Sequence, residues 1–209
     1  MGGIIAHNKI KVFMVRFKVE ECITPTMYEV RFHGRGGQGA VTAANILAIA
    51  AVKQGFYAQS FPYFGVERRG APVQAFTRID DKKIDIRMNV YNPDAVVVLD
   101  PSLMDVIDVT EGLKEGGIIV INTSKKPEEF ELKNFKIATV NATEIALRHH
   151  LGSQAAPIVN TSILGAYARA VGNVKVEYVV EAIRENAPAK KEENALAAKE
   201  AYEQTVLGW

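Results

Sequence analysis

Hydrophobic and polar residues change their spacing several times along this chain, and the first clear change lies at residues 28–54. Apolar and polar residues alternate over 28–33, which is typical of a strand. Four glycines then fall within residues 34–39, and the Ala-rich stretch 40–54 repeats apolar residues at helical spacing. The pattern predicts a strand, a glycine-rich turn and a helix in that order.

The rest of the chain continues to alternate between strand-like and helix-like patterns. Strands are expected at 56–61, 73–79, 84–90, 92–100, 118–122 and 136–141, and helices at 101–114, 126–133, 142–151, 157–171, 176–186 and 192–204. The polar residues 80–83 separate two alternating stretches, 73–79 and 84–90, which is the signature of a β-hairpin. This order predicts an α/β fold with three layers, Rossmann-like, with a mostly parallel sheet, an inserted β-hairpin and C-terminal helices.

The length of the chain and one interruption of its strand and helix pattern predict the domain organisation. A chain of 209 residues can bury one sizeable core, so residues 27–209 are expected to form a single domain. Residues 1–26 end in Cys-Ile-Thr-Pro-Thr, which breaks the pattern before the first strand. They are an N-terminal extension: either an extra strand or arm, or sequence upstream of a start at Met27.

The glycine turn has the composition of an anion-binding loop. Gly34, Gly36 and Gly39 satisfy the G-x-G-x-x-G spacing. Glycine permits a positive φ and a close approach of the backbone to a ligand, and the N–H groups at the start of the next helix attract a phosphate. A tight turn that only packs against its surroundings would have the same composition, so both interpretations stay open.

The residues after the loop narrow the choice of nucleotide. An NAD site needs an acidic residue at the end of the second strand, but 56–61 has none and the next acid is Glu67. Arg68 and Arg69 follow, and arginine suits a nucleotide with an additional ribose phosphate. NADP, coenzyme A or no nucleotide remain as alternatives.

Composition and absent motifs exclude several classes of function. The net charge is +1, which does not favour nucleic acid or a membrane surface as partner. Cys22 is the single cysteine, which excludes an internal disulfide and a four-cysteine iron–sulfur cluster and fits a reducing, cytoplasmic compartment. The chain has no phosphate loop of the NTPase type, no nucleophile elbow and no metal-ligand spacing. This composition indicates a binding subunit whose chemistry belongs to another chain.

Single polar residues receive mainly structural interpretations. His33 ends the first strand and is expected to be a structural residue, and His149 and His150 are expected to cap the end of their helix. Asn160 and Thr161 are polar within an apolar half-helix. They either cap that helix or face a ligand.

Three stretches together resemble a known family. They are residues 28–39, 61–72 and 92–100, with the sequences Tyr-Glu-Val-Arg-Phe-His-Gly-Arg-Gly-Gly-Gln-Gly, Phe-Pro-Tyr-Phe-Gly-Val-Glu-Arg-Arg-Gly-Ala-Pro and Asn-Pro-Asp-Ala-Val-Val-Val-Leu-Asp. This ordered set closely resembles the gamma subunits of archaeal pyruvate and 2-ketoisovalerate ferredoxin oxidoreductases, in the 2-oxoacid:ferredoxin oxidoreductase family. The resemblance covers residues 27–206.

The resemblance implies one subunit of a four-chain enzyme, alongside alpha, beta and delta subunits. Such an enzyme decarboxylates a 2-oxo acid oxidatively to acyl-coenzyme A and CO2 and reduces ferredoxin. Thiamine diphosphate, Mg and iron–sulfur clusters would lie on the partner chains, and the gamma subunit would contribute to the coenzyme A site. The residues implied are Gly34, Arg35, Gly36, Gly37, Gln38 and Gly39, with Arg68 and Arg69 for a phosphate, and no catalytic residue or metal ligand. A stand-alone NADP-dependent oxidoreductase and a purely structural subunit remain as alternatives.

Overall fold

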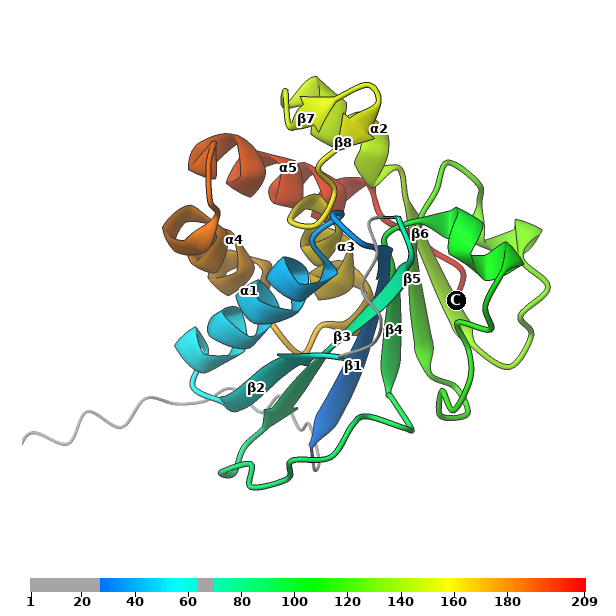
Figure 1. Ribbon diagram of the computed structural model, residues 1–209, viewed down its shortest axis with the longest axis vertical. Helices are drawn as coiled ribbons and strands as arrows, with labels where there is room; N and C mark the ends of the chain where they lie inside the picture. Colours follow the sequence, from blue (N-terminus) through cyan, green and yellow to red (C-terminus); the bar gives the residue numbers. More distant parts are fainter. Residues whose placement is uncertain (1–26, 64–69) are drawn as a thin grey trace, which may run out of the picture.

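A seven-stranded mixed sheet organises the protein, which the computed structural model describes over residues 27–63 and 70–209 (Figure 1). The strand order is β2-β3-β1-β4-β5-β6-β9. Strands β1, β4, β5 and β6 are parallel to their neighbours within that group, whereas β3 and β9 run antiparallel to theirs. The strands are β1 (Tyr28–Arg35), β2 (Tyr57–Pro62), β3 (Pro72–Asp80), β4 (Ala95–Val98), β5 (Ile118–Asn122), β6 (Lys136–Val140) and β9 (Val206–Leu207).

Helices cover the two faces of this sheet unequally. Figure 1 shows α1, α3, α4 and α5 together on one side, with α2 and the small hairpin β7–β8 near the end of the sheet. None of the helices in the described part of the chain is long and apolar enough to cross a bilayer. The helices are α1 (Ala40–Lys53), α2 (Ala142–Arg148), α3 (Ser162–Val171), α4 (Val176–Asn186) and α5 (Lys191–Gln204), the 3-10 turns are η1 (Pro101–Asp105) and η2 (Pro127–Glu129), and the hairpin is β7 (Gly152–Ser153) with β8 (Ala156–Pro157).

The core has one part on each face of the sheet. Val97 and Val120 belong to the larger cluster, which lies between the sheet and the helices. Val96, Val98 and Ile119 face the other way, into a smaller cluster covered by side chains from the 3-10 turns and connecting segments. Burial on both faces explains why β4 and β5 are continuous apolar runs rather than alternating ones. The predicted α/β class, with its mostly parallel sheet and C-terminal helices, is therefore confirmed.

The predicted hairpin of 73–79 with 84–90 is wrong in its second arm. Strand β3 pairs antiparallel with β2 on one side and with β1 on the other, and residues 84–90 form no strand. Side chains hold this segment: Gln59 Nε2 donates to Ile84 O at 2.7 Å and Arg78 Nη2 donates to Asn89 O at 3.2 Å. Alternation predicts an extended backbone, but it does not supply a neighbouring strand.

The predicted helix 101–114 is also wrong, because only the short turn η1 forms there. The Asp108 carboxylate accepts hydrogen bonds from Thr110 N at 2.8 Å and from Thr110 Oγ1 at 2.6 Å. Such a local turn competes with helical hydrogen bonding, and Gly112 then takes a φ of 69°. The expected helices 126–133, 142–151 and 157–171 are shorter than predicted, whereas 176–186 is correct at both ends.

Candidate functional site

The glycine loop connects strand β1 to helix α1, as predicted. Gly37 and Gly39 have φ values of 95° and 81°, in the region that residues with side chains rarely adopt. A Cβ atom on Gly39 would lie 2.2 Å from Nδ2 of Asn160. Glycine at position 39 is therefore required both by the backbone conformation and by this close approach.

Hydrogen bonds fix the loop but leave the start of α1 open. Gly36 N donates to Ala71 O at 2.9 Å, and Gln38 N donates to Arg35 O at 2.9 Å. Gly39 is the N-cap of α1 and has no side chain to offer, and no other described side chain caps this helix. The first N–H groups of α1 thus stay available to an anion, which the helix dipole also attracts.

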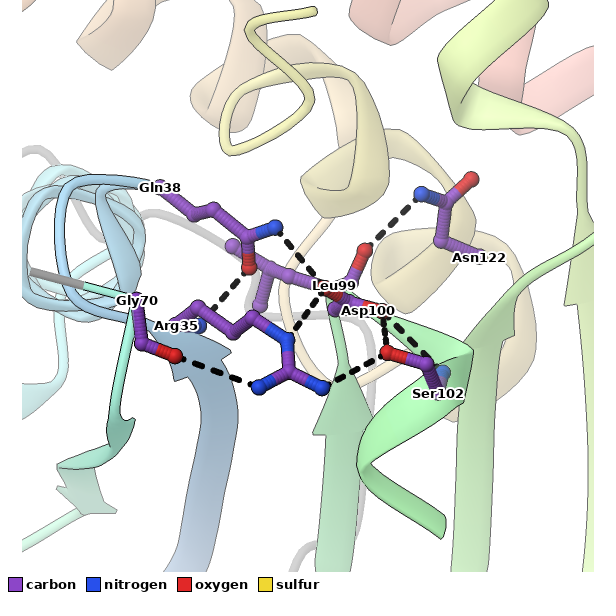
Figure 2. A network of polar contacts seen from close by, with 7 residues as sticks. All are labelled: Arg35, Gln38, Gly70, Leu99, Asp100, Ser102 and Asn122. Atoms are coloured by element: carbon purple, nitrogen blue, oxygen red, sulfur yellow. Dashed lines mark hydrogen bonds and ion pairs between the residues drawn. The ribbon is translucent and has the colours of Figure 1, made fainter. Parts of the chain in front are cut away.

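A polar network behind the loop centres on Asp100 (Figure 2). Arg35 Nε and Gln38 Nε2 both donate to Asp100 Oδ2, at 3.0 and 3.1 Å. Ser102 donates to Oδ1 through its backbone N at 3.0 Å and its Oγ at 2.6 Å. Arg35 also donates to Gly70 O at 3.1 Å and to Ser102 Oγ at 2.8 Å. The loop is therefore tied to the ends of both β4 and β3.

This network sets the charge of Asp100. Partial desolvation acts to raise the pKa of the Asp100 carboxyl, but hydrogen bonds from Ser102 and Gln38 and the charge of Arg35 outweigh it. The pKa of Asp100 is therefore held below its ordinary value, and the carboxylate stays ionised beside the Arg35 guanidinium. Asp100 therefore neutralises the positive charge of Arg35 within the protein.

A cavity of about 780 Å³ opens in front of the loop, at the carboxyl ends of the parallel strands. Ligands of open α/β sheets usually bind at this edge. Gly36, Gly37, Gln38 and Gly39 line the cavity. Gly34 and Arg35 do not line it, because Gly34 pairs with β3 and Arg35 points toward Asp100. Arg68 and Arg69 lie outside the described residues.

Several cavity residues were missed from the sequence. Asn122, at the end of β5, donates through Nδ2 to Leu99 O at 2.8 Å and to Thr143 Oγ1 at 3.0 Å. Asp100 and Asn122 each follow a buried apolar run, and this was the signal available in the sequence. Because parallel strands end at the same edge of a sheet, polar residues at those ends meet in space.

The two polar residues before α3 have different roles. Thr161 is the N-cap of α3, and its hydroxyl donates to Asn194 Oδ1 at 2.5 Å. Asn160 lines the cavity and is 8% exposed, and its Oδ1 has no hydrogen-bond donor among the described residues. Thr161 thus occupies the N-cap position without a side-chain capping hydrogen bond, and both residues line the cavity. A ligand contact of either residue stays a prediction.

His33 is structural rather than a candidate base. It is fully buried, and its Nε2 accepts a hydrogen bond from Arg31 Nε at 2.9 Å. Desolvation, followed by the charge of Arg31, lowers the pKa of His33 to about 3. The imidazole is therefore neutral near pH 7, and it does not line the cavity. Within residues 27–63 and 70–209, no group of three or more His, Cys, Asp or Glu residues is placed to hold a metal ion.

The order of the strands removes the usual dinucleotide geometry. In a Rossmann fold the second strand lies beside the first and carries the ribose-binding acid at its end. Here β3 lies between β1 and β2, and it runs antiparallel to both. The start of β3, at Pro72, therefore pairs with Arg35 at the position where that acid would be expected.

Comparison with known proteins agrees with this arrangement. The model of the family "Pyruvate ferredoxin/flavodoxin oxidoreductase" matches residues 29–204. The pyruvate/ketoisovalerate oxidoreductases common subunit gamma of Thermococcus kodakarensis is 61% identical over 186 residues, which cover 87% of this chain and 98% of that protein. The crystal structure of pyruvate oxidoreductase subunit PORC (EC 1.2.7.1) from Thermotoga maritima matches with a TM-score of 0.74 and 38% identity, over 88% of this chain and 99% of that one. The 2-oxoglutarate:ferredoxin oxidoreductase of Magnetococcus marinus, with coenzyme A bound, shares the fold at a TM-score of 0.63 and 17% identity, over 85% of this chain and 30% of that one.

The fold is a mixed α/β sheet with a cavity in front of its glycine loop. The chain belongs to the pyruvate ferredoxin/flavodoxin oxidoreductase family. Within that family it is a gamma subunit of the pyruvate/ketoisovalerate type, and so a part of a multi-subunit 2-oxoacid:ferredoxin oxidoreductase of the pyruvate synthase class. The resemblance stated from the sequence is confirmed.

Proposed function

We propose that this gamma subunit holds part of coenzyme A, the acyl acceptor of the complex, in the cavity at Gly36–Gly39. One observation carries the proposal: the uncapped start of α1 opens, through three glycines and Gln38, into a cavity of about 780 Å³. A diphosphate suits such a helix start, because N–H groups and the helix dipole both favour negative charge.

The charges around the loop refine the proposed roles of its arginines. Arg35 is a positioning residue, because its guanidinium is engaged by Asp100, Ser102 and Gly70. Arg68 and Arg69 remain the proposed partners of a further phosphate, since guanidinium groups bind phosphate bidentately. A position of these two arginines near the bound phosphate is part of this proposal.

The rest of the enzyme is assigned to partner chains. We propose that alpha, beta and delta subunits carry thiamine diphosphate, Mg and the iron–sulfur clusters, and that the cytoplasmic complex passes its electrons to ferredoxin. Residues 27–209 would form the gamma-type domain of this assembly, with residues 1–26 as an extension. A single cysteine, Cys22, agrees with clusters held elsewhere.

The test is Gly36→Asp in the purified multi-subunit enzyme. A carboxylate at the cavity wall would repel a phosphate, so the apparent KM for coenzyme A should rise about tenfold or more, which corresponds to about 1.4 kcal/mol. The KM for the 2-oxo acid should stay unchanged. Asn134→Asp is the control, because Asn134 is exposed and does not line the cavity, so the added carboxylate should leave the KM for coenzyme A unchanged.

A purely structural role for the loop makes the opposite forecast, and the approach of Asn160 to Gly39 is the observation that favours it. In that case Gly36→Asp would reduce assembly, and the assembled fraction would keep the original KM for coenzyme A. An intact complex with an unchanged KM for coenzyme A would show that the assignment of coenzyme A to this loop is wrong.

A further inference from the structure

The side chain of Asn160 is the least satisfied polar group of the cavity. It stands just before α3, lines the cavity beside Gly39 of the glycine loop and is 8% exposed. Its Oδ1 atom is buried without a donor in the part of the chain that the structure describes. Buried amides normally have partners, so an amide without one at a cavity wall indicates a ligand contact.

The cavity around Asn160 combines apolar and polar side chains and is nearly uncharged. Gln38, Thr42, Asn122 and Thr143 contribute amides and hydroxyls to the cavity. Asp100 supplies a charge, but Arg35 already neutralises it. Within residues 27–63 and 70–209, no lysine or arginine lines the cavity. Apart from the helix start, this wall therefore suits a neutral group better than a phosphate.

An amide side chain pairs best with a group that presents a donor and an acceptor side by side. We infer that Asn160 recognises such a neutral donor–acceptor group on the ligand, and so acts as a specificity-determining residue distinct from the phosphate-binding loop. This inference rests on the proposed function, because the ligand is taken to be coenzyme A.

Coenzyme A carries this chemistry in two places. The pantetheine arm has two amides, and the adenine base has an amino group next to a ring nitrogen, which asparagine can bind in bidentate fashion. The pantetheine arm lies on one side of the diphosphate and the adenosine on the other. With the diphosphate at Gly36–Gly39, Asn160 can therefore contact one of the two. The shared chemistry is a neutral pair of hydrogen-bonding groups.

The experiment uses the purified complex with Asn160→Leu, which keeps the approximate volume but removes both hydrogen-bonding groups. Dissociation constants are measured for coenzyme A, and for pantetheine and adenosine 3′,5′-bisphosphate by competition with labelled coenzyme A. Coenzyme A should bind about tenfold more weakly, and one fragment only should lose affinity. Loss for adenosine 3′,5′-bisphosphate identifies the base as the partner, and loss for pantetheine identifies an amide.

Controls separate recognition from disruption. Asn134→Leu, at an exposed residue outside the cavity, should change no constant. Asn160→Ser is a second variant that stays uncharged but removes the paired amide donor and acceptor, and the same single fragment should weaken. Unchanged binding of coenzyme A in both Asn160 variants overturns the inference, and so does an effect that spares both fragments or weakens both equally.

The inference and the proposed function fail in different ways. If Gly36→Asp weakens coenzyme A and the Asn160 variants do not, the loop assignment stands and the role of Asn160 is wrong. If only the Asn160 variants weaken it, the cavity binds coenzyme A but the phosphate does not lie at the loop. If neither position matters, both are wrong.

Discussion

Asp100→Asn is the most informative single change in the network behind the loop. The carboxylate accepts from Arg35 and Gln38 through Oδ2 and from Ser102 twice through Oδ1. Asparagine keeps the shape but replaces one oxygen by an NH2 group, which cannot accept. Whichever way the amide turns, either the Arg35–Gln38 pair or the Ser102 pair loses its acceptor.

The size of the effect follows from these contacts. A hydrogen bond to a charged group contributes about 1.5–3 kcal/mol, but solvent screens the Arg35–Asp100 pair, whose side chains are 32% and 18% exposed. We expect the free energy of unfolding to fall by roughly 1–3 kcal/mol. The pKa of Asp100 is lowered in the folded state, so its contribution is present above the ordinary carboxyl pKa and is lost as the pH falls through the lowered value.

Two measurements check this prediction. Denaturant unfolding gives the loss of stability, and amide hydrogen exchange at Gln38, whose N–H donates to Arg35 O, reports whether the loop opens. Ser102→Ala is the milder comparison, because it removes the hydroxyl that donates to Asp100 and accepts from Arg35 but leaves the carboxylate as the acceptor of Arg35 and Gln38. If Asp100→Asn leaves both the unfolding free energy and the exchange at Gln38 unchanged, the network does not hold the loop and our reasoning is wrong.

Two further predictions concern the core. The pKa of His33 is about 3 when folded and about 6.5 when unfolded, so the free energy of unfolding should fall as the pH drops between these values, by at most roughly 4–5 kcal/mol. Denaturant titrations should show a flatter pH dependence of stability for His33→Gln. An equally steep dependence would contradict burial of a neutral imidazole. A Cβ on Gly165 would lie 1.7 Å from Ala198 O, so Gly165→Ala should force α3 and α5 apart and lower the unfolding free energy by roughly 3 kcal/mol or more. Gly172→Ala, where only a φ of 74° is strained and the space is open, should cost about 1 kcal/mol; equal losses would argue against the helix contact.

Local pattern was sufficient where an element is decided by its own residues. The strand 118–122 and the helix 176–186 form over the residues that the sequence indicates, because one is a buried apolar run and the other a regular amphipathic repeat. It failed where a contact from elsewhere decides. Residues 84–90 alternate correctly, but side chains of Gln59 and Arg78, rather than another strand, hold their backbone.

The candidate site divides along the same line. The glycine loop could be predicted because the strand, the loop and the helix are contiguous in the sequence. Its surroundings could not, because β4, β5 and the start of α3 meet it only through the topology of the sheet. Arg35 shows the consequence: the sequence places it in the candidate cofactor-binding loop, whereas the fold pairs its charge with Asp100. A motif therefore locates a candidate site, but the side chains that the fold adds around it decide which charges and hydrogen-bonding groups are free for a ligand.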